Sequence, residues 1–163
     1  MADLPLRTAI MIQQIRRRFS SNRGQTLIEF AFIAPLMIIF LFVIVDFGLA
    51  LDRRSTVQHA VREGGRRGAV TDDIGSVIDR TVAQSQGLLE AGDVTVCYED
   101  VGGNGNPGDP GDNVRVSATF TYNFTIAFAE IFNAFGASIP SGIVMTPSAD
   151  MRLENSVGGA PPC

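Results

Sequence analysis

Glu29 lies in a segment of the chain that is otherwise suited to lipid. Phe30 to Val45 are sixteen consecutive apolar or proline residues, and Leu27 and Ile28 stand just before the glutamate. A charged side chain at bilayer depth costs about 2.5 to 3.5 kcal/mol on insertion scales, so its presence is a functional hypothesis by default. The alternative is a carboxylate near the helix end that snorkels to the membrane surface, where the cost shrinks.

The residues around Gly24 add a second chemical feature, a candidate site of peptide-bond cleavage. Arg23 and Gly24 stand ahead of Gln25, and Glu29 follows Gly24 by five residues. This pattern resembles the processing site of a type IV pilin-like prepilin. The resemblance implies that Gly24 is the last residue of a leader, Gln25 the new N-terminus and Glu29 the fifth residue of the mature chain. We expect glycine at the cleavage position because the peptidase must approach a residue without Cβ.

The apolar segment has the length of a membrane span. Leu27 to Val45 comprise about 20 residues, enough to cross a hydrocarbon core of ~30 Å. A helix from Gln25 should run through this span and well beyond it, because no Gly-Pro or Asn-Gly break occurs before Gly64. Pro35 interrupts it, and we expect a kink or local unwinding there.

Charge distribution limits the functions open to the chain. All thirteen basic residues are arginine, and five of them precede Gly24. Without residues 1–24, eight arginines face sixteen carboxylates, a formal charge of −8. No basic footprint for nucleic acid survives in the mature chain.

Arginines near the two ends of the span balance in number, so the positive-inside rule gives no orientation. We place the N-terminus in the cytoplasm because the far arginines are interleaved with helical sequence and the acidic C-terminal part looks exported.

A nearly bare helical face follows the span. Ala60, Gly64 and Gly68 recur at i, i+4 and i+8, and Val57, Val61 and Gly65 lie beside them. Because each glycine costs a helix about 1 kcal/mol relative to alanine, such a face normally lets another backbone approach closely. That backbone belongs either to the chain's own sheet or to another subunit. Arg62–Arg66 and Glu63–Arg67 have the i, i+4 spacing.

The C-terminal part predicts a second helix and a small sheet. Thr71, Asp72 and Asp73 form a helix N-cap and an acidic first turn, and the helix should end near Gly87 to Gly92. Alternating apolar residues predict three strands, over residues 94–98, 114–124 and 149–153. Apolar residues at helical spacing predict a short amphipathic helix before the last strand: Phe128, Ile131, Phe132 and Phe135.

Few residues outside the helix suggest a site. The glycine-, proline- and asparagine-rich segment 102–112 predicts a flexible, solvated hairpin connection, and its spacing does not match a calcium loop. His59 has no metal-ligand partner at a suitable spacing and is expected to be solvated. No nucleophile elbow, phosphate-binding loop or His/Cys cluster occurs, so we predict no enzyme activity, cofactor or metal.

Cys97 and Cys163 are predicted to form a disulfide. An exported domain meets an oxidising compartment, and two cysteines in a chain of this size favour pairing. Cys97 faces away from the apolar side of its strand, where the C-terminal tail could reach it. The alternatives are a buried free thiol with a frayed tail and an intermolecular bridge.

Three motifs in order carry a family resemblance: the segment from Arg23 to Pro35, Asp46-Phe47-Gly48, and the segment from Ala60 to Val70. Together they resemble the TadE-like family, the pseudopilins or minor pilins of tight-adherence (Flp) pili. The resemblance implies an α+β, type IV pilin-like fold with a long N-terminal transmembrane helix, a second helix, a three-stranded antiparallel sheet and a short helix. It divides the chain into a cytoplasmic leader (1–24), the helix and its extension (25–70) and an extracytoplasmic domain (71–163).

The same resemblance implies the partners and the site residues. They are a prepilin peptidase acting after Gly24 at the bacterial inner membrane, inner-membrane lipid, and other pilin and pilus-assembly subunits. Glu29 would neutralise the freed amine of a neighbouring Gln25, and we assign Glu29, Phe30 and Pro35 to assembly.

Two other readings remain open. Gly48-Leu49-Ala50 is an acceptable signal-peptidase site after an apolar region, although Asp46 and the length of the run speak against it. The chain could also be a plain single-pass anchored envelope protein. The mature N-terminus separates the three readings, because it would be Gln25 for a pilin-like protein, Leu51 for a secreted one and close to Met1 for a simple anchor.

Overall fold

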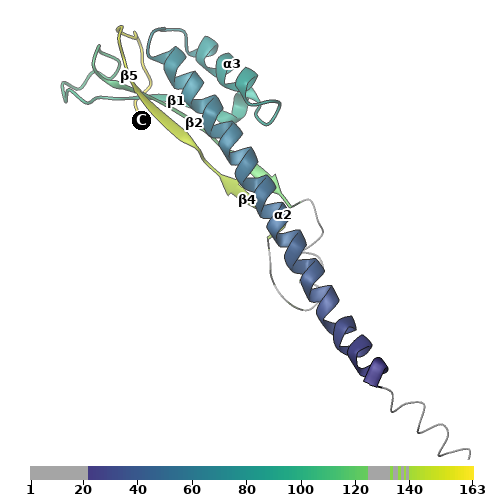
Figure 1. The fold of residues 1–163 in the computed structure, drawn as a ribbon. Coiled ribbons are helices and arrows are strands. Elements are labelled where there is room, and N and C mark those ends of the chain that lie inside the picture. Colours follow the sequence, from purple (N-terminus) through teal and green to yellow (C-terminus); the bar gives the residue numbers. More distant parts are fainter. Residues whose placement is uncertain (1–21, 125–132, 134–135, 137, 139) are drawn as a thin grey trace, which may run out of the picture. The chain divides into compact units, whose positions relative to one another are not determined.

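The computed structural model describes residues 22–124, 133, 136, 138 and 140–163 (Figure 1). The predicted leader up to residue 21 and the predicted short helix with Phe128, Ile131, Phe132 and Phe135 lie outside the described residues. The chain forms two compact units, 1–44 and 45–163. A long N-terminal apolar helix, a second helix and a small antiparallel sheet confirm the α+β, pilin-like class.

The first described element, α2, is a helix of 47 residues, Asn22–Gly68. It continues through Pro35, so the local unwinding suggested by the proline does not occur. A proline removes one helical hydrogen bond, and the intact turns on both sides keep the helical path. At the other end the N–H of Ala69 donates to the Gly65 carbonyl at 2.9 Å, which closes the last turn.

The second helix, α3, comprises Ile74–Gln84. Asp73 occupies the N-cap position, but its side chain makes no capping hydrogen bond. Because Asp72 and Asp73 both precede the helix, the prediction of an acidic first turn was wrong. The helix also ends earlier than expected, at Gln84, after burying Val77 and Thr81 against the rest of the domain.

Three antiparallel strands form the main sheet, as the sequence predicted, and the structure arranges them in the order β1-β2-β5. Their bounds are Val94–Glu99, Asn113–Ala118 and Ser148–Arg152. A one-turn helix, η1 (Ala91–Asp93), leads into β1. Val116 pairs with Val96 on one side and with Ala149 on the other, so β2 is the central strand.

A two-stranded ribbon, β3 (Phe120–Asn123) with β4 (Gly142–Met145), completes the domain. The sequence predicted one continuous strand over 114–124, but the ladder breaks at Thr119, whose N–H donates to the Asp93 carbonyl at 2.9 Å. The buried face continues across the break through Ala118, Phe120 and Tyr122, so residue alternation could not reveal it. β4 was not predicted from the sequence, because its apolar residues do not alternate with polar ones.

The bare face of α2 packs on the chain's own sheet and on α3. Val57, Ala60 and Val61 are fully buried. A Cβ added at Gly64 would overlap Thr81 Oγ1, and one at Gly65 would lie 3.0 Å from Met151 Cγ. A Cβ at Gly68 would lie 3.1 Å from Val114 Cγ2. The glycines therefore let the sheet and the second helix approach the backbone of α2 closely.

The C-terminal tail closes the free edge of β1. The Tyr98 N–H donates to the Pro161 carbonyl at 2.8 Å, and the Cys163 N–H donates to the Tyr98 carbonyl at 3.0 Å. The structure joins Cys97 to Cys163 by a disulfide, with a Cα–Cα distance of 5.0 Å and a sequence separation of 66. In the chain-entropy model, closing a loop of that size contributes about 4 kcal/mol to stability.

We predict that Gly64→Ala destabilises the domain. Alanine favours a helix by about 1 kcal/mol over glycine, but overpacking a filled core typically costs about 1 to 3 kcal/mol, and the added methyl would overlap Thr81 Oγ1. Gly48→Ala is the matched control on α2, because a Cβ there has no atom within 4 Å. Denaturant unfolding in detergent micelles should show a lower midpoint for Gly64→Ala and an equal or higher one for Gly48→Ala.

The double variant Gly64→Ala with Thr81→Ala should recover part of the loss, because it removes the overlapping hydroxyl. Equal midpoints for the two single glycine variants would contradict the close packing of α2.

Candidate processing and assembly site

Gly24 and Gln25 lie in the first turn of α2, which begins at Asn22. Glycine weakens a helix by about 1 kcal/mol relative to alanine, so Gly24 makes local unwinding of α2 at the Gly24–Gln25 peptide bond less costly. A Cβ at Gly24 would meet no described atom within 4 Å, so packing in the described structure does not require glycine there.

Gln25 and Glu29 lie on the same face of α2, one turn apart. The Gln25 side-chain Nε2 donates to Glu29 Oε1 at 3.2 Å, and both residues are exposed. This contact pairs the carboxylate with a neutral amide. The geometry places the backbone nitrogen of Gln25, which cleavage would turn into an amine, one helical turn from the carboxylate.

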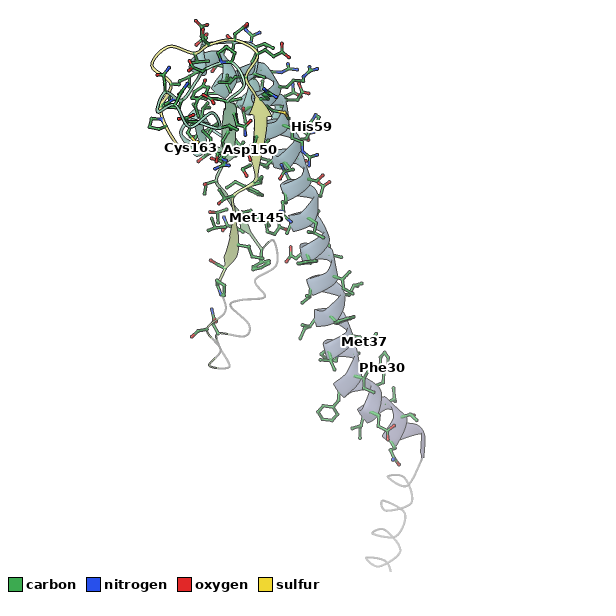
Figure 2. All side chains as sticks on the ribbon, turned by 90° about the vertical axis from the view of Figure 1, so that its left-hand side faces the viewer. Phe30, Met37, His59, Met145, Asp150 and Cys163 are labelled. Atoms are coloured by element: carbon green, nitrogen blue, oxygen red, sulfur yellow. A yellow bond between two sulfur atoms is a disulfide. The ribbon has the colours of Figure 1, made fainter. Side chains whose placement is uncertain are left out.

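Phe30 and Pro35, the other predicted assembly residues, are exposed on the same helix. Figure 2 shows Phe30 and Met37 projecting from α2, and their exposed fractions are 67% and 60%. Large apolar side chains are exposed on every side of the helix between Leu27 and Val45. α2 is long and apolar enough to cross a membrane by length and composition. A helix that is apolar all round needs lipid or other apolar surroundings.

Asp46, the first residue after the apolar run, is buried in the unit 45–163. Its exposed fraction is 4%, and the Tyr122 hydroxyl donates to Asp46 Oδ1 at 3.2 Å. Tyr122 in turn stacks edge-to-face on Phe124, with ring centroids 6.0 Å apart. Sequence reasoning used Asp46 as the end of the span, as part of the family motif and as an argument against signal-peptidase cleavage, but did not predict its burial in the domain. Two features of the sequence could have suggested this contact. Asp46 is a carboxylate next to an apolar span, and Tyr122 lies on the predicted buried face of a strand.

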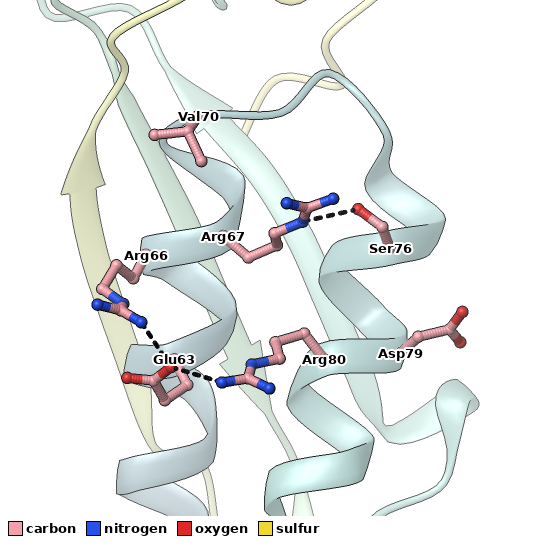
Figure 3. A pocket seen from close by; sticks show the side chains of 7 residues that line it. All are labelled: Glu63, Arg66, Arg67, Val70, Ser76, Asp79 and Arg80. Atoms are coloured by element: carbon pink, nitrogen blue, oxygen red, sulfur yellow. Dashed lines mark hydrogen bonds and ion pairs between the residues drawn. The ribbon is translucent and has the colours of Figure 1, made fainter.

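An exposed group of charged residues lies between α2 and α3 (Figure 3). Glu63 accepts hydrogen bonds from Arg80 at 3.2 Å and from Arg66 at 3.4 Å. Arg67, which the i, i+4 spacing placed opposite Glu63, instead donates to Ser76 Oγ at 3.4 Å. The hydrogen bond from Arg80 is the largest cause that lowers the Glu63 pKa, and the nearby Arg66 charge adds to it. Only the Glu63–Arg80 pair joins α3 to α2, and because it is solvent-exposed it fastens the two helices only weakly.

The segment predicted to be a flexible loop is ordered by two carboxylates. Asp112 Oδ1 accepts the N–H groups of Val101 and Gly102, and Oδ2 accepts those of Gly108 and Asp109, at 3.0 to 3.3 Å. Asp100 accepts three further backbone N–H groups, from Gly103, Asn104 and Gly105. The segment is a solvent-exposed hairpin connection, as predicted, but aspartates hold its backbone through carboxylate–amide hydrogen bonds that its composition did not reveal.

The same hydrogen bonds argue against a cation-binding site in this loop. N–H dipoles already aim their positive ends at the oxygens of Asp100 and Asp112, which suits an anion-like acceptor and opposes a metal ion. Among the described residues, no group of three or more His, Cys, Asp or Glu side chains could hold a metal ion. His59 is exposed on α2.

We predict that Asp112→Asn loosens the loop. Burial raises the Asp112 pKa, but the backbone hydrogen bonds outweigh it, and the pKa lies below its ordinary value of 3.8. A lowered folded pKa means that this stabilisation is fully present above the unfolded pKa and is lost as pH falls through the folded pKa. NMR signals of the Val101, Gly102, Gly108 and Asp109 amides should stay constant from neutral pH to about pH 5 and shift only well below pH 4.

Asp112→Asn should move those amide signals at neutral pH, whereas Asp79→Asn, a control at an exposed position on α3, should not. Unchanged amides in Asp112→Asn would show that the carboxylate does not order the loop.

Residues 24–66 match the family described as TadE-like protein. The match confirms the resemblance read from the sequence, and it covers all five predicted processing and assembly residues. No curated protein and no solved structure matched the chain. The family match and the N-terminal apolar helix fit a membrane-anchored protein related to Tad pili.

Proposed function

We propose that this chain is a pseudopilin or minor pilin, anchored in the bacterial inner membrane, cleaved after Gly24 and active in assembly of a tight-adherence pilus. One observation carries the proposal. Residues 24–66 match the TadE-like family and lie almost entirely in one helix, α2. This helix contains the Gly24–Glu29 pattern, the apolar span and the glycine face on which the sheet packs. The activity is structural. The partners are a prepilin peptidase, inner-membrane lipid, and other pilin and pilus-assembly subunits.

Cleavage would act on the first turn of α2. The peptidase would need the substrate locally extended, and Gly24 lowers the cost of unwinding α2 there, because glycine weakens a helix by about 1 kcal/mol relative to alanine. Hydrolysis of the Gly24–Gln25 bond removes the arginine-rich leader and creates a cationic amine at Gln25. The N-terminus is cytoplasmic in this proposal, and the unit 45–163 is extracytoplasmic.

Glu29 would then supply the charge that compensates that amine. In lipid, a lone ammonium and a lone carboxylate are each costly, and pairing them offsets much of both costs. The amine of Gln25 on one subunit and Glu29 on a neighbouring subunit would thus favour the alignment of their helices. Phe30 and Pro35 lie on the same exposed part of α2 and would contact the neighbouring helix.

The alternatives are a plain single-pass anchor and a protein secreted by cleavage after Ala50. Ala50 is 1% exposed and lies inside α2, and Asp46 is hydrogen-bonded within the domain. Cleavage after Ala50 would remove both residues from the core, which favours retention of the whole helix.

We predict that Gly24→Ile leaves an uncleaved precursor, about 24 residues heavier on a gel, because a branched side chain blocks the peptidase. Gly48→Ile is the control, since that position has no contact within 4 Å and lies beyond the processing site. Mass spectrometry should find Gln25 at the N-terminus of the parent and of the control. An N-terminus at Leu51 would support secretion, and one near Met1 in all three proteins would support a plain anchor.

We predict that Glu29→Val is inserted and cleaved normally but fails to support pili. Removing the carboxylate lowers the desolvation cost of insertion, so a defect that remains must lie in assembly. Gln25→Ala is the matched control, because it keeps the backbone amine and removes only the side-chain amide that contacts Glu29. Counting pili by electron microscopy should show loss in Glu29→Val and retention in Gln25→Ala. Normal pilus number in Glu29→Val would disprove the assembly role.

A further inference from the structure

The ribbon of β3 and β4 exposes apolar side chains and carries no charge. Neither Phe120–Asn123 nor Gly142–Met145 contains an acidic or basic residue. The exposed fraction is 64% for Val144 and 38% for Ile143. Exposed edge strands normally carry charged residues that prevent strands of other molecules from pairing with them. An uncharged apolar ribbon is therefore expected to have a cover.

Contacts along α2 fix the height of the ribbon within the unit 45–163. Val114, on β2, packs at Gly68, near the end of α2. Val116 packs at Gly64, and Tyr122, further along the chain on β3, bonds to Asp46. The path from β2 to β3 therefore runs antiparallel to α2, towards the residues that adjoin the apolar run.

The exposed apolar residues of β4 are level with the end of that run. Ile143 pairs directly with Tyr122, and Val144 pairs with Thr121 beside it. Tyr122 is held to Asp46, and Asp46 follows Val45, the last residue of the apolar run. Ile143 and Val144 thus lie level with Asp46, the first residue after the apolar run.

We propose that the β3–β4 ribbon rests on the lipid surface through Val144, making a second membrane contact beside the transmembrane helix. This inference rests on the membrane anchoring in the proposed function. Burying apolar side chains at the headgroup level is favourable, at about 25 cal/mol per Å² of apolar surface removed from water. Because the ribbon carries no charged side chain, entering the region between the headgroups and the acyl chains would not require a charge to lose its water.

The hydrogen bond between Tyr122 and Asp46 gives this contact its geometry. It joins the ribbon to α2 one residue beyond the apolar run, so insertion of the helix brings the ribbon to the membrane surface. A second copy of the chain is a less suitable cover, because the ribbon has no charged group to set the register of a protein partner.

Single-tryptophan variants of the full chain test the contact, because the native sequence contains no tryptophan. Val144→Trp reports on the ribbon. Val101→Trp is the matched control, because Val101 is 59% exposed and belongs to the loop before β2, near the Gly68 end of α2. Phe40→Trp, in the apolar run, reports on helix insertion. Each variant is reconstituted into phosphatidylcholine vesicles whose acyl chains are brominated either close to the headgroup or deep in the bilayer.

The inference expects shallow bromines to quench the emission of Val144→Trp, deep bromines to quench it less, and neither to quench Val101→Trp. Deep bromines should quench Phe40→Trp. If Phe40→Trp is quenched and Val144→Trp is as unquenched as Val101→Trp, the ribbon does not contact lipid. Blue-shifted but unquenched emission from Val144→Trp would assign the cover to a second copy and also overturn the inference. Absence of quenching in Phe40→Trp would instead refute membrane anchoring.

Discussion

The fold of the unit 45–163 depends on the close approach of its sheet to the glycine face of α2. A Cβ at Gly64 would overlap Thr81, and one at Gly65 or Gly68 would make a tight contact with Met151 or Val114. Val57 and Val61 of α2 are fully buried in the same core, together with larger side chains of the sheet such as Tyr98. α2 is thus the central support of the domain, and the strands and α3 are held through it.

The same helix has a second kind of apolar surface. From Leu27 to Val45 its large side chains are exposed on all sides, whereas from Val57 onward its apolar residues are buried by protein. The change lies between Asp46, which is hydrogen-bonded to Tyr122, and Val57, because Phe47, Leu49 and Leu51 are still exposed. Lipid or other subunits must cover the first part, and the sheet covers the second. This division suits a subunit that is held in a membrane and presents a folded domain outside it.

Local patterns were sufficient to predict the main elements. Hydrophobic length predicted the span, the spacing of Ala60, Gly64 and Gly68 predicted a close-packed face, and alternation predicted the three main strands. Two features depended on contacts distant in sequence and could not be predicted. The break at Thr119 is set by the Asp93 carbonyl, and the ordered loop is set by Asp112, whose four N–H partners were not apparent from composition. From the sequence, the bare face of α2 could have packed on the chain's own sheet or on another subunit, and the structure shows that it packs on the chain's own sheet.

Amide hydrogen exchange along α2 in lipid nanodiscs tests the central claim, that lipid and the sheet protect separate parts of one helix. The measurement compares the native chain with Gly64→Leu, whose side chain would separate the sheet from the helix. We expect amides from Val57 to Gly68 to lose protection in the variant while those from Leu27 to Val45 keep it. Equal loss in both parts, or no loss from Val57 to Gly68, would contradict the account.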